Sequence, residues 1–380
     1  MVKNRNGVLV KLIPDRVPGN NMQDQFFKGL KVVEFASVLA GPAVGMFFAE
    51  LGAEVLKIEN KTTGGDVTRG WKQSSEDPAS PISAYWCSVN WGKKHLFLDL
   101  KNPQDQAQAK TLALAADVVI SNFKPSSARQ MGVDADTLRA ENPRLIYAQL
   151  NSYADPEDES PAFDAVLQAE AGFLFMNGEP GRPPVKMPVA LIDILAAHQL
   201  KEAILLALLQ RERTGLGSTV STSLMESALA SLANQASNYL MNGHIPQRMG
   251  SRHPNIAPYG DMFLCADGQT LLLAVGTERQ FVHLCGVLDL ENLLQDPDYQ
   301  TNTARVQNRT ELIALLETRI GQLTLNEAMA KLNAAGVPAA RIRDLQSVFE
   351  MPAAQQMVLE DQQPDGTQTK RVKTIAFKIG

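Results

Sequence analysis

Short β-rich runs alternate with helical apolar stripes at the start of the chain. Residues 30–35 form a β-rich run, residues 42–51 carry an apolar stripe with helical spacing, and residues 53–59 form a second β-rich run. Pro42 suits the first turn of a helix, where its missing N–H has no partner to lose. Gly52 suits the position just after a helix ends. The pattern predicts a βαβ unit with parallel strands.

The same alternation continues to about residue 150. Further strands are predicted at residues 96–100, 116–120 and 144–150, and Asn102-Pro103 marks the start of another helix. Strands and helices that alternate in this way are typical of a parallel sheet with helices on both faces. We therefore expect a doubly wound, Rossmann-like α/β domain.

Longer helices are predicted in the second half. They cover residues 163–176, 192–213, 223–241 and much of 305–335, and residues 188–192 have the pattern of a strand. Residues 262–266 and 270–275 flank Asp267-Gly268 and read as a β-hairpin. This mixture predicts a second, smaller α+β domain.

Composition narrows the class of protein. A chain of 380 residues exceeds what one core usually organises, which favours two domains. The net charge of -5 offers neither a basic face for nucleic acid nor a polybasic anchor for a membrane. No stretch approaches the ~18 apolar residues of a membrane span, and residues 1–28 look like an irregular extension rather than a signal peptide. We expect a cytoplasmic protein that partners neither nucleic acid nor membrane.

Several common chemistries lack their motifs. The first strand-to-helix turn, residues 40–45, does not match the G-x-G-x-x-G of dinucleotide-binding proteins, although Glu59 could supply the acid that follows it. No Walker-type loop or G-x-S-x-G elbow is found. The five histidines and three scattered cysteines (Cys87, Cys265 and Cys285) have no zinc-ligand spacing. We expect no metal and no permanently bound cofactor.

Two aspartates near predicted helix starts, Asp164 and Asp193, are the candidate reactive groups. Either could stabilise its helix as a cap or first-turn acid, by about 1 kcal/mol. Asp193 has the apolar pairs Leu191-Ile192 and Ile194-Leu195 on its two sides. A carboxylate buried among such residues is costly unless it is paired or functional. From the residues alone, both interpretations stay open.

The motifs resemble those of the class III CoA-transferases, the group of formyl-CoA, carnitine and bile-acid transferases. The resemblance runs in order from about residue 29 to the end. The matching blocks are residues 30–35, 39–42, 51–59, 65–70, 90–94, 116–125, 142–147, 163–172, 213–217, 250–260 and 266–268.

The resemblance implies an enzyme that takes acyl-CoA and a carboxylic acid as substrates. It makes Asp193 the nucleophile and gives Asp164 an orienting or capping role. The backbone N–H groups of the Gly250 loop or of the Leu39-Ala40 turn are candidate oxyanion donors. The resemblance also implies CoA contacts along the first turn and the neighbouring strand ends. These residues are Val38, Leu39, Ala40, Asn60, Lys61, Asn122, Phe123, Met131 and Gly250. Leu39 stands where one subgroup has Gln, and Asn60 with Lys61 where it has Arg, which leaves the acyl preference open.

Two alternatives stay open. Related α-methylacyl-CoA racemases have a His where this chain has Phe163, and phenylalanine cannot move a proton. A non-catalytic CoA-binding protein would bind CoA without exchange, whereas a nicotinamide dehydrogenase is disfavoured by the missing glycines.

The resemblance also implies an assembly and a domain plan. It implies an interlocked homodimer, with linkers near residues 214–222 and 335–345 as the crossing segments. The plan assigns residues 1–28 to an extension, 29–222 to a large CoA-binding domain, 223–334 to a small domain and 335–380 to a return to the large domain.

Overall fold

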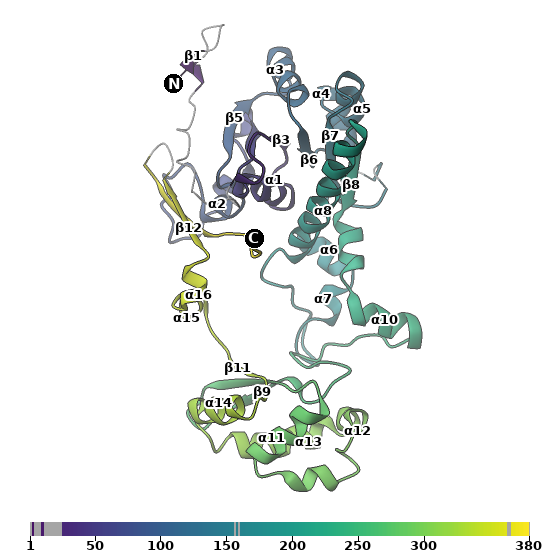
Figure 1. Cartoon of the computed structure of the whole chain (residues 1–380), viewed down its shortest axis with the longest axis vertical. Helices are drawn as coiled ribbons and strands as arrows, with labels where there is room; N and C mark the ends of the chain where they lie inside the picture. The colour runs from purple at the N-terminus through teal and green to yellow at the C-terminus, as the bar shows by residue number, and fades with distance from the viewer. Residues whose placement is uncertain are drawn as a thin grey trace. The chain divides into compact units, whose positions relative to one another are not determined.

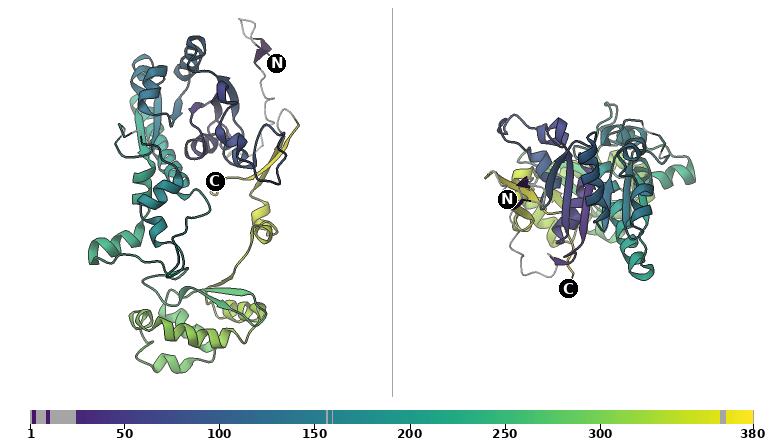
Figure 2. Two further views of the ribbon diagram at one scale, coloured as in Figure 1. Left: turned by 180° about the vertical axis from the view of Figure 1, so that it is seen from behind. Right: turned by 90° about the horizontal axis from the view of Figure 1, so that it is seen from above.

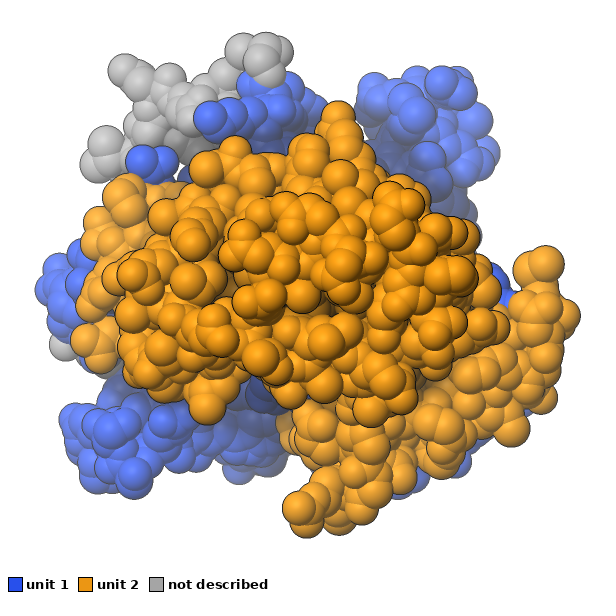
Figure 3. Space-filling view, turned by 90° about the horizontal axis from the view of Figure 1, so that it is seen from below, with its two compact units in different colours: residues 1–171, 187–237, 356–380 blue, residues 172–186, 238–355 orange. Residues whose placement is uncertain are grey.

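The computed structural model describes residues 2–3, 9–10, 25–155, 157–158, 160–362 and 366–379. The chain divides into two compact units, coloured in Figure 3. Unit 1 holds residues 1–171, 187–237 and 356–380, and unit 2 holds residues 172–186 and 238–355. Most of the predicted N-terminal extension lies outside the described residues. The functional domain plan stays a prediction.

Unit 1 is built on a six-stranded parallel sheet (Figure 1). Its strands, in spatial order, are β5 (Lys94–Leu98), β4 (Glu54–Asn60), β3 (Lys31–Phe35), β6 (Val118–Ser121), β7 (Ile146–Asn151) and β8 (Thr219–Ser223). Numbered along the chain within this sheet, the order is 3-2-1-4-5-6, which is that of doubly wound dinucleotide-binding folds. The order reverses between β3 and β6, and such a reversal opens a crevice at the carboxyl ends of the strands.

Helices cover both faces of the sheet (Figure 2). On one face, Val33 and Phe35 of β3 join an apolar core with α3 (Pro103–Leu114) and α5 (Ala135–Glu141). On the other face lie α1 (Ala40–Glu50) and the long helix α8 (Leu191–Thr214), which contact each other. Both faces are therefore covered, as the near-continuous apolar runs of the parallel strands require.

The remaining elements of unit 1 are short. They are β1 (Val2–Lys3), β2 (Leu9–Val10), η2 (Lys61–Thr63), η3 (Val67–Gly70), α2 (Ala84–Asn90), α4 (Pro125–Met131), α6 (Asp164–Glu170), α9 (Leu224–Ala230), β12 (Val358–Gln362) and β13 (Gln368–Val372). Strands β12 and β13 form an antiparallel hairpin from the C-terminal segment.

Unit 2 has a three-stranded antiparallel sheet. It consists of β9 (Tyr259–Leu264), β10 (Thr270–Ala274) and β11 (Ala339–Arg341), so the predicted hairpin is confirmed. Its helices are α7 (Phe173–Met176), α11 (Glu278–Val287), η4 (Glu291–Gln295), α12 (Asn302–Gln307), α13 (Arg309–Ile320), α14 (Leu325–Ala334), α15 (Leu345–Phe349) and α16 (Pro352–Gln355). The division between the units falls within α10 (Ala233–Asn242). None of the described helices is both long and apolar enough to cross a membrane.

Three predictions of local structure were wrong. The helix expected over 163–176 is two helices, because Gly172 adopts φ +85° between α6 and α7. The helix expected over 223–241 is also divided, into α9 and α10, and Ala233 there has φ +49°. Residues 188–190 form no strand, and α8 begins at Leu191. Both expected linkers contain a strand, β8 in one and β11 in the other.

Candidate active site

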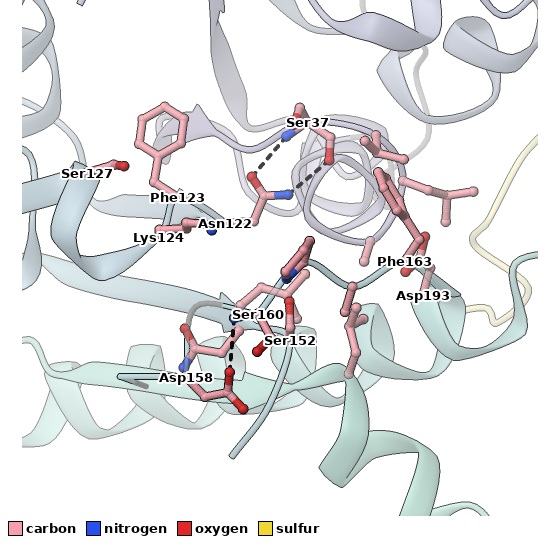
Figure 4. Close-up of a pocket in the computed structure, with 18 of the residues that line it drawn as sticks. Ser37, Asn122, Phe123, Lys124, Ser127, Ser152, Asp158, Ser160, Phe163 and Asp193 are labelled. Atoms are coloured by element: carbon pink, nitrogen blue, oxygen red, sulfur yellow. Dashed lines mark hydrogen bonds between the residues drawn. The ribbon is translucent and has the colours of Figure 1, made fainter. Parts of the chain in front are cut away.

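A pocket of about 540 Å³ lies at the carboxyl edge of the parallel sheet in unit 1. Its walls come from the segments after β3 and β6, from the end of β7, and from the N-terminal turn of α8 (Figure 4). The lining includes Ser37, Val38, Leu39, Ala40, Asn122, Phe123, Leu150, Ser152, Asp158, Phe163 and Asp193. The pocket therefore occupies the crevice that the strand order opens between β3 and β6.

Asp193 is a buried carboxylate without a hydrogen-bond partner in the described part of the chain. It lies in the first turn of α8, is 8% exposed, and forms part of the pocket wall beside Phe163 in Figure 4. Burial, and after it the charge of the nearby Asp164, raises the pKa of Asp193 to about 7. A carboxylate that is buried, unpartnered and open to a pocket has the features of a reactive group.

Asp164 orients the turn that carries Asp193. One of its carboxylate oxygens accepts a hydrogen bond from the N–H of Ile192 at 2.7 Å, and the other accepts one from Nε2 of Gln168 at 2.6 Å. Oε1 of Gln168 in turn accepts a hydrogen bond from the N–H of Met187 at 2.9 Å. Asp164 is therefore not a cap of its own helix, since Phe163 holds that position. It acts on the start of α8.

A sequence model of CoA-transferase family III matches residues 27–379. The chain belongs to this family. It is an enzyme of the CoA-transferase class, as its relatives' names also indicate.

Named relatives match along most of this family III CoA-transferase. A succinate–glutarate CoA-transferase of Agrobacterium fabrum is 36% identical over 91% of this chain and 88% of its own length. A succinyl-CoA:glutarate CoA-transferase of Homo sapiens is 32% identical over 86% of this chain and 73% of its own. An acetyl-CoA:oxalate CoA-transferase of Acetobacter aceti is 32% identical over 88% and 85%.

Solved structures show the same fold. A CaiB/BaiF family protein from Brucella suis is 37% identical, covers 93% of each chain and has a TM-score of 0.78. A protein from Mycobacterium tuberculosis is 30% identical, covers 94% of each chain and has a TM-score of 0.80. The mixed α/β architecture of this family III CoA-transferase is thus that of experimentally solved relatives.

Tyr85 lies near the two aspartates of the site, and sequence reasoning did not single it out. It lies in α2 and is half-buried, with its ring in edge contact with Trp71 at 5.1 Å between ring centroids. Burial, and after it the charges of Asp193 and Asp164, raises the pKa of Tyr85 to about 12. The phenol is thus neutral at physiological pH, and it lies close enough to both aspartates for their charges to affect its pKa. No local pattern links it to them, because the fold alone brings the helices together.

The first turn of the site has an unusual backbone. Val38 has φ +72°, which a β-branched residue rarely adopts. The side chain of Asn122, one of the predicted CoA contacts, is bound to both backbone groups of Ser37 (Figure 4). Its amide therefore shapes the pocket wall rather than extending freely into the pocket.

The pocket brings some of the predicted residues together and leaves others outside its described lining. Val38, Leu39, Ala40, Asn122, Phe123 and Asp193 line it. Met131 packs against the core around α3 and α5 instead. Asn60 caps η2, accepting a hydrogen bond from the N–H of Thr62 at 2.9 Å, and Lys61 is exposed. Gly250 belongs to unit 2, where its N–H donates to the carbonyl of Gly178 at 2.8 Å.

Among the described residues, no group of three or more His, Cys, Asp or Glu side chains is arranged to hold a metal ion.

Proposed function

We propose that this enzyme moves CoA from an acyl-CoA to a carboxylic acid through covalent intermediates on Asp193. The observation that carries the proposal is the state of Asp193: 8% exposed, without a described hydrogen-bond partner, and in the wall of the pocket. Such a carboxylate is poorly solvated. Poor solvation makes a carboxylate a better nucleophile and so favours its attack on a carbonyl carbon.

The first half of the reaction loads CoA onto the enzyme. A carboxylate oxygen of Asp193 attacks the thioester carbon of the donor, the C–S bond breaks, and a mixed anhydride and CoA thiolate form. The thiolate then attacks the aspartyl carbonyl. The anhydride C–O bond breaks, the donor acid leaves as its carboxylate, and an aspartyl-CoA thioester remains.

The second half transfers CoA to the acceptor. The acceptor carboxylate attacks the aspartyl thioester and releases CoA thiolate, which gives a second mixed anhydride. The thiolate attacks the acceptor acyl carbon, and Asp193 leaves as a free carboxylate. No proton is gained or lost overall, so the enzyme needs a nucleophile and oxyanion donors rather than an acid–base pair.

The N-terminus of α1 is the proposed source of oxyanion donors. Leu39 is its N-cap and makes no side-chain cap hydrogen bond, and Pro42 has no N–H to offer. The N–H groups of Ala40 and Gly41, in the first helical positions, have no intrahelical acceptor and lie at the positive end of the helix dipole. Donors of this kind stabilise the oxyanion of a tetrahedral intermediate.

CoA is proposed to contact the pocket residues Val38, Leu39, Ala40, Asn122 and Phe123. Contacts with Asn60, Lys61, Met131 and Gly250 remain part of the proposal from family resemblance. Because several relatives are named for succinate and glutarate, we propose succinyl-CoA and glutarate as the first donor and acceptor to test.

A homodimer is the proposed assembly, interlocked as the family resemblance implies. On the long helix α8, Leu206 is 68% exposed and Leu209 is 51% exposed in the single chain. Exposed leucines on one helix are costly to leave in water, and a second copy would cover them. Light scattering at two protein concentrations measures the assembly directly.

Intact-protein mass spectrometry after addition of succinyl-CoA tests the mechanism. We expect a covalent CoA adduct on the wild type. Hydroxylamine should remove the CoA and leave a modification on the peptide that contains Asp193. Asp193→Asn should form no adduct. Asp158→Asn changes a second carboxylate of the same pocket, and it should keep the adduct. An adduct on Asp193→Asn, or none on the wild type with CoA bound, would overturn the proposal.

A further inference from the structure

The segment that joins β3 to α1 is held by side chains from other elements. Nζ of Lys57 on β4 donates a hydrogen bond to the carbonyl oxygen of Ala36 at 2.5 Å. The next residue, Ser37, is held at both backbone groups by Asn122: its N–H donates to Oδ1 at 3.2 Å, and its carbonyl accepts from Nδ2 at 3.1 Å. These hydrogen bonds hold the backbone beyond the point where the strand-to-strand hydrogen bonds of β3 end.

The third residue of the segment, Val38, is held by Asp66. The N–H of Val38 donates to the Asp66 carboxylate, at 3.2 Å to Oδ2 and 3.4 Å to Oδ1. Val38 has φ +72°, where a β-branched residue is sterically disfavoured and persists only if its surroundings enforce it. The hydrogen bond to Asp66 is the described contact that fixes this N–H in its direction.

Asp66 is itself fixed within a buried network of charges. Its Oδ2 lies 3.0 Å from Nζ of Lys57, which also lies 2.9 Å from Oε1 of Glu34. Burial alone would lower the pKa of Lys57, but Glu34 and Asp66 outweigh it and raise the pKa. Oδ1 of Asp66 accepts hydrogen bonds from the N–H and the hydroxyl of Thr68 at 3.0 and 2.8 Å. A carboxylate with this many partners cannot follow Val38 if the turn relaxes.

The backbone of Asp66 is anchored as well. Its N–H donates to Oε2 of Glu59 at 2.7 Å, and the same oxygen accepts from Nε of Arg69 at 2.7 Å. Gly65 makes this approach feasible, because a Cβ at that position would lie 2.5 Å from Oε2 of Glu59. The sequence block 65–70 is thus explained as the support of one carboxylate that faces the first turn.

We propose that Asp66 is a positioning residue for CoA transfer, which holds Val38 in its left-handed conformation and thereby sets Leu39 and Ala40 in the wall of the Asp193 pocket. This inference rests on the proposed function. The physical argument is that positive φ is sterically unfavourable for Val38 and needs a contact from another residue to maintain it. Without the acceptor, rotation to negative φ relieves the strain and moves the following residues, including the proposed oxyanion donors at the start of α1.

Three variants separate this role from a general loss of structure. Asp66→Ala removes the acceptor, and we expect kcat per reactive site to fall about 100-fold, as for a displacement of about 1 Å. Val38→Gly alone is the reference for the double variant, because both lack the Val38 side chain at the proposed CoA contact and glycine adopts positive φ at no steric cost. The double variant should recover at least about tenfold of the lost kcat, since glycine lets the turn regain its geometry without Asp66.

Asp134→Ala is the matched control. Asp134 also caps a short helix and accepts from the N–H and hydroxyl of a threonine, Thr137, at 3.0 and 2.7 Å. It lies outside the described lining of the pocket. We expect its kcat to stay within about twofold of the wild type. Reactive sites are counted in each variant by the amount of CoA adduct, so that unfolded protein does not distort kcat.

Hydrogen exchange of the peptide covering residues 36–40 gives a readout besides activity. Asp66→Ala should speed exchange there, while Asp134→Ala should not. The inference is overturned if exchange in Asp66→Ala is unchanged or if Asp66→Ala keeps the wild-type kcat. It is also overturned if adding Val38→Gly to Asp66→Ala does not restore kcat. A wild type that transfers no CoA overturns the proposed function and the positioning role of Asp66 together. If the wild type is fully active and Asp66→Ala has the same kcat, the positioning role alone is overturned.

Discussion

Asp193 should set the pH dependence of the reaction. Attack requires the carboxylate, and burial followed by the charge of Asp164 raises the pKa of Asp193 to about 7. We therefore expect kcat/KM to fall about tenfold per pH unit below pH ~7 and to level off above it. A series of initial rates from pH 5 to pH 9 measures this limb.

Asp164→Asn should move that limb to lower pH. The variant removes the neighbouring negative charge, which lowers the pKa of Asp193, while the amide oxygen can still accept from the N–H of Ile192. Asp158→Asn is the control, because its carboxylate is exposed and is not among the causes of the shift. A limb that stays in place or moves upward in Asp164→Asn would contradict the argument.

The same pKa makes a prediction about stability. Asp193 has an ordinary value of 3.8 and a folded value of about 7, so between these limits the folded chain binds more protons than the unfolded chain. Stability therefore falls as pH rises through this window, by up to about 4 kcal/mol for one group. Asp193→Asn cannot ionise and should be more stable than the wild type at pH 8, with little difference at pH 4.

Tryptophan fluorescence during urea unfolding measures this difference. All three tryptophans (Trp71, Trp86 and Trp91) belong to unit 1, as Asp193 does, so the signal follows the unit that carries the change. Equal stability at pH 8 would show that the Asp193 carboxylate is solvated in the folded chain, against the burial described here.

Some residues of the site could be predicted and others could not. The apolar pairs around Asp193 marked it as an unusual acid, and the family resemblance made it the nucleophile. The proximity of Tyr85 to the aspartates and the contact of Asp66 with Val38 were not predicted. Both depend on contacts between distant parts of the fold, for which local sequence gives no signal. Asn60, which was predicted to contact CoA, is a contrasting case. Its side chain accepts a hydrogen bond from the N–H of Thr62, two residues further on, and this local contact accounts for an Asn at that position.

At the scale of elements, the approach of α1 to β3 depends on a glycine. A Cβ at Gly45 would lie 2.0 Å from Oε2 of Glu34. That carboxylate is bound at 2.9 Å by Lys57 and at 2.8 Å by Lys93, so it cannot turn aside without leaving a buried ammonium unpaired. We expect Gly45→Ala to destabilise unit 1 by about 3 kcal/mol or more.

Gly70→Ala provides the comparison for Gly45→Ala. Gly70 is exposed, and a Cβ there meets nothing within 4 Å. It should change stability by less than about 0.5 kcal/mol in the same fluorescence assay. A loss below about 1 kcal/mol for Gly45→Ala would mean that α1 can move away from β3.

Element boundaries follow the strength of the local pattern. Strand β3 and helix α1 were predicted because apolar residues and Pro42 mark them clearly. Strand β8 was missed, because Thr219–Ser223 contains only Val220 as an aliphatic residue and takes its place by pairing with β7. The break after α6 depends on φ +85° at Gly172. A single glycine in an apolar helical pattern is compatible with a continuous helix, so the pattern could not locate it.

At the scale of the whole chain, unit 1 is completed by the C-terminal segment. Glu50 at the end of α1 pairs with Arg371 of β13, 321 residues further along. Its carboxylate also accepts from the N–H groups of Thr374 and Ile375, both at 3.1 Å. No local pattern could predict such a pair, because its two partners lie at opposite ends of the sequence.

Breaking this pair should release the C-terminal segment from unit 1. The side chains of Glu50 and Arg371 are 3% and 4% exposed, and removal of one partner leaves the other charge buried. We expect Glu50→Ala to cost about 3–5 kcal/mol of stability in unit 1. Fluorescence should report it, since the Arg371 guanidinium lies 4.7 Å from the ring centroid of Trp91. Limited proteolysis should cut residues 366–379 sooner.

A second ion pair in the same hairpin separates anchoring from simple loss of charge. Glu360 on β12 and Lys370 on β13 are 2.7 Å apart, but their side chains are 61% and 67% exposed. Water already solvates both groups, so Glu360→Ala should cost no more than about 0.5 kcal/mol and leave proteolysis unchanged. If the two variants released the segment equally, the hairpin would be held by its own strand pairing and not by Glu50. If only Glu50→Ala does so, the end of α1 is the site to which the C-terminal segment is attached.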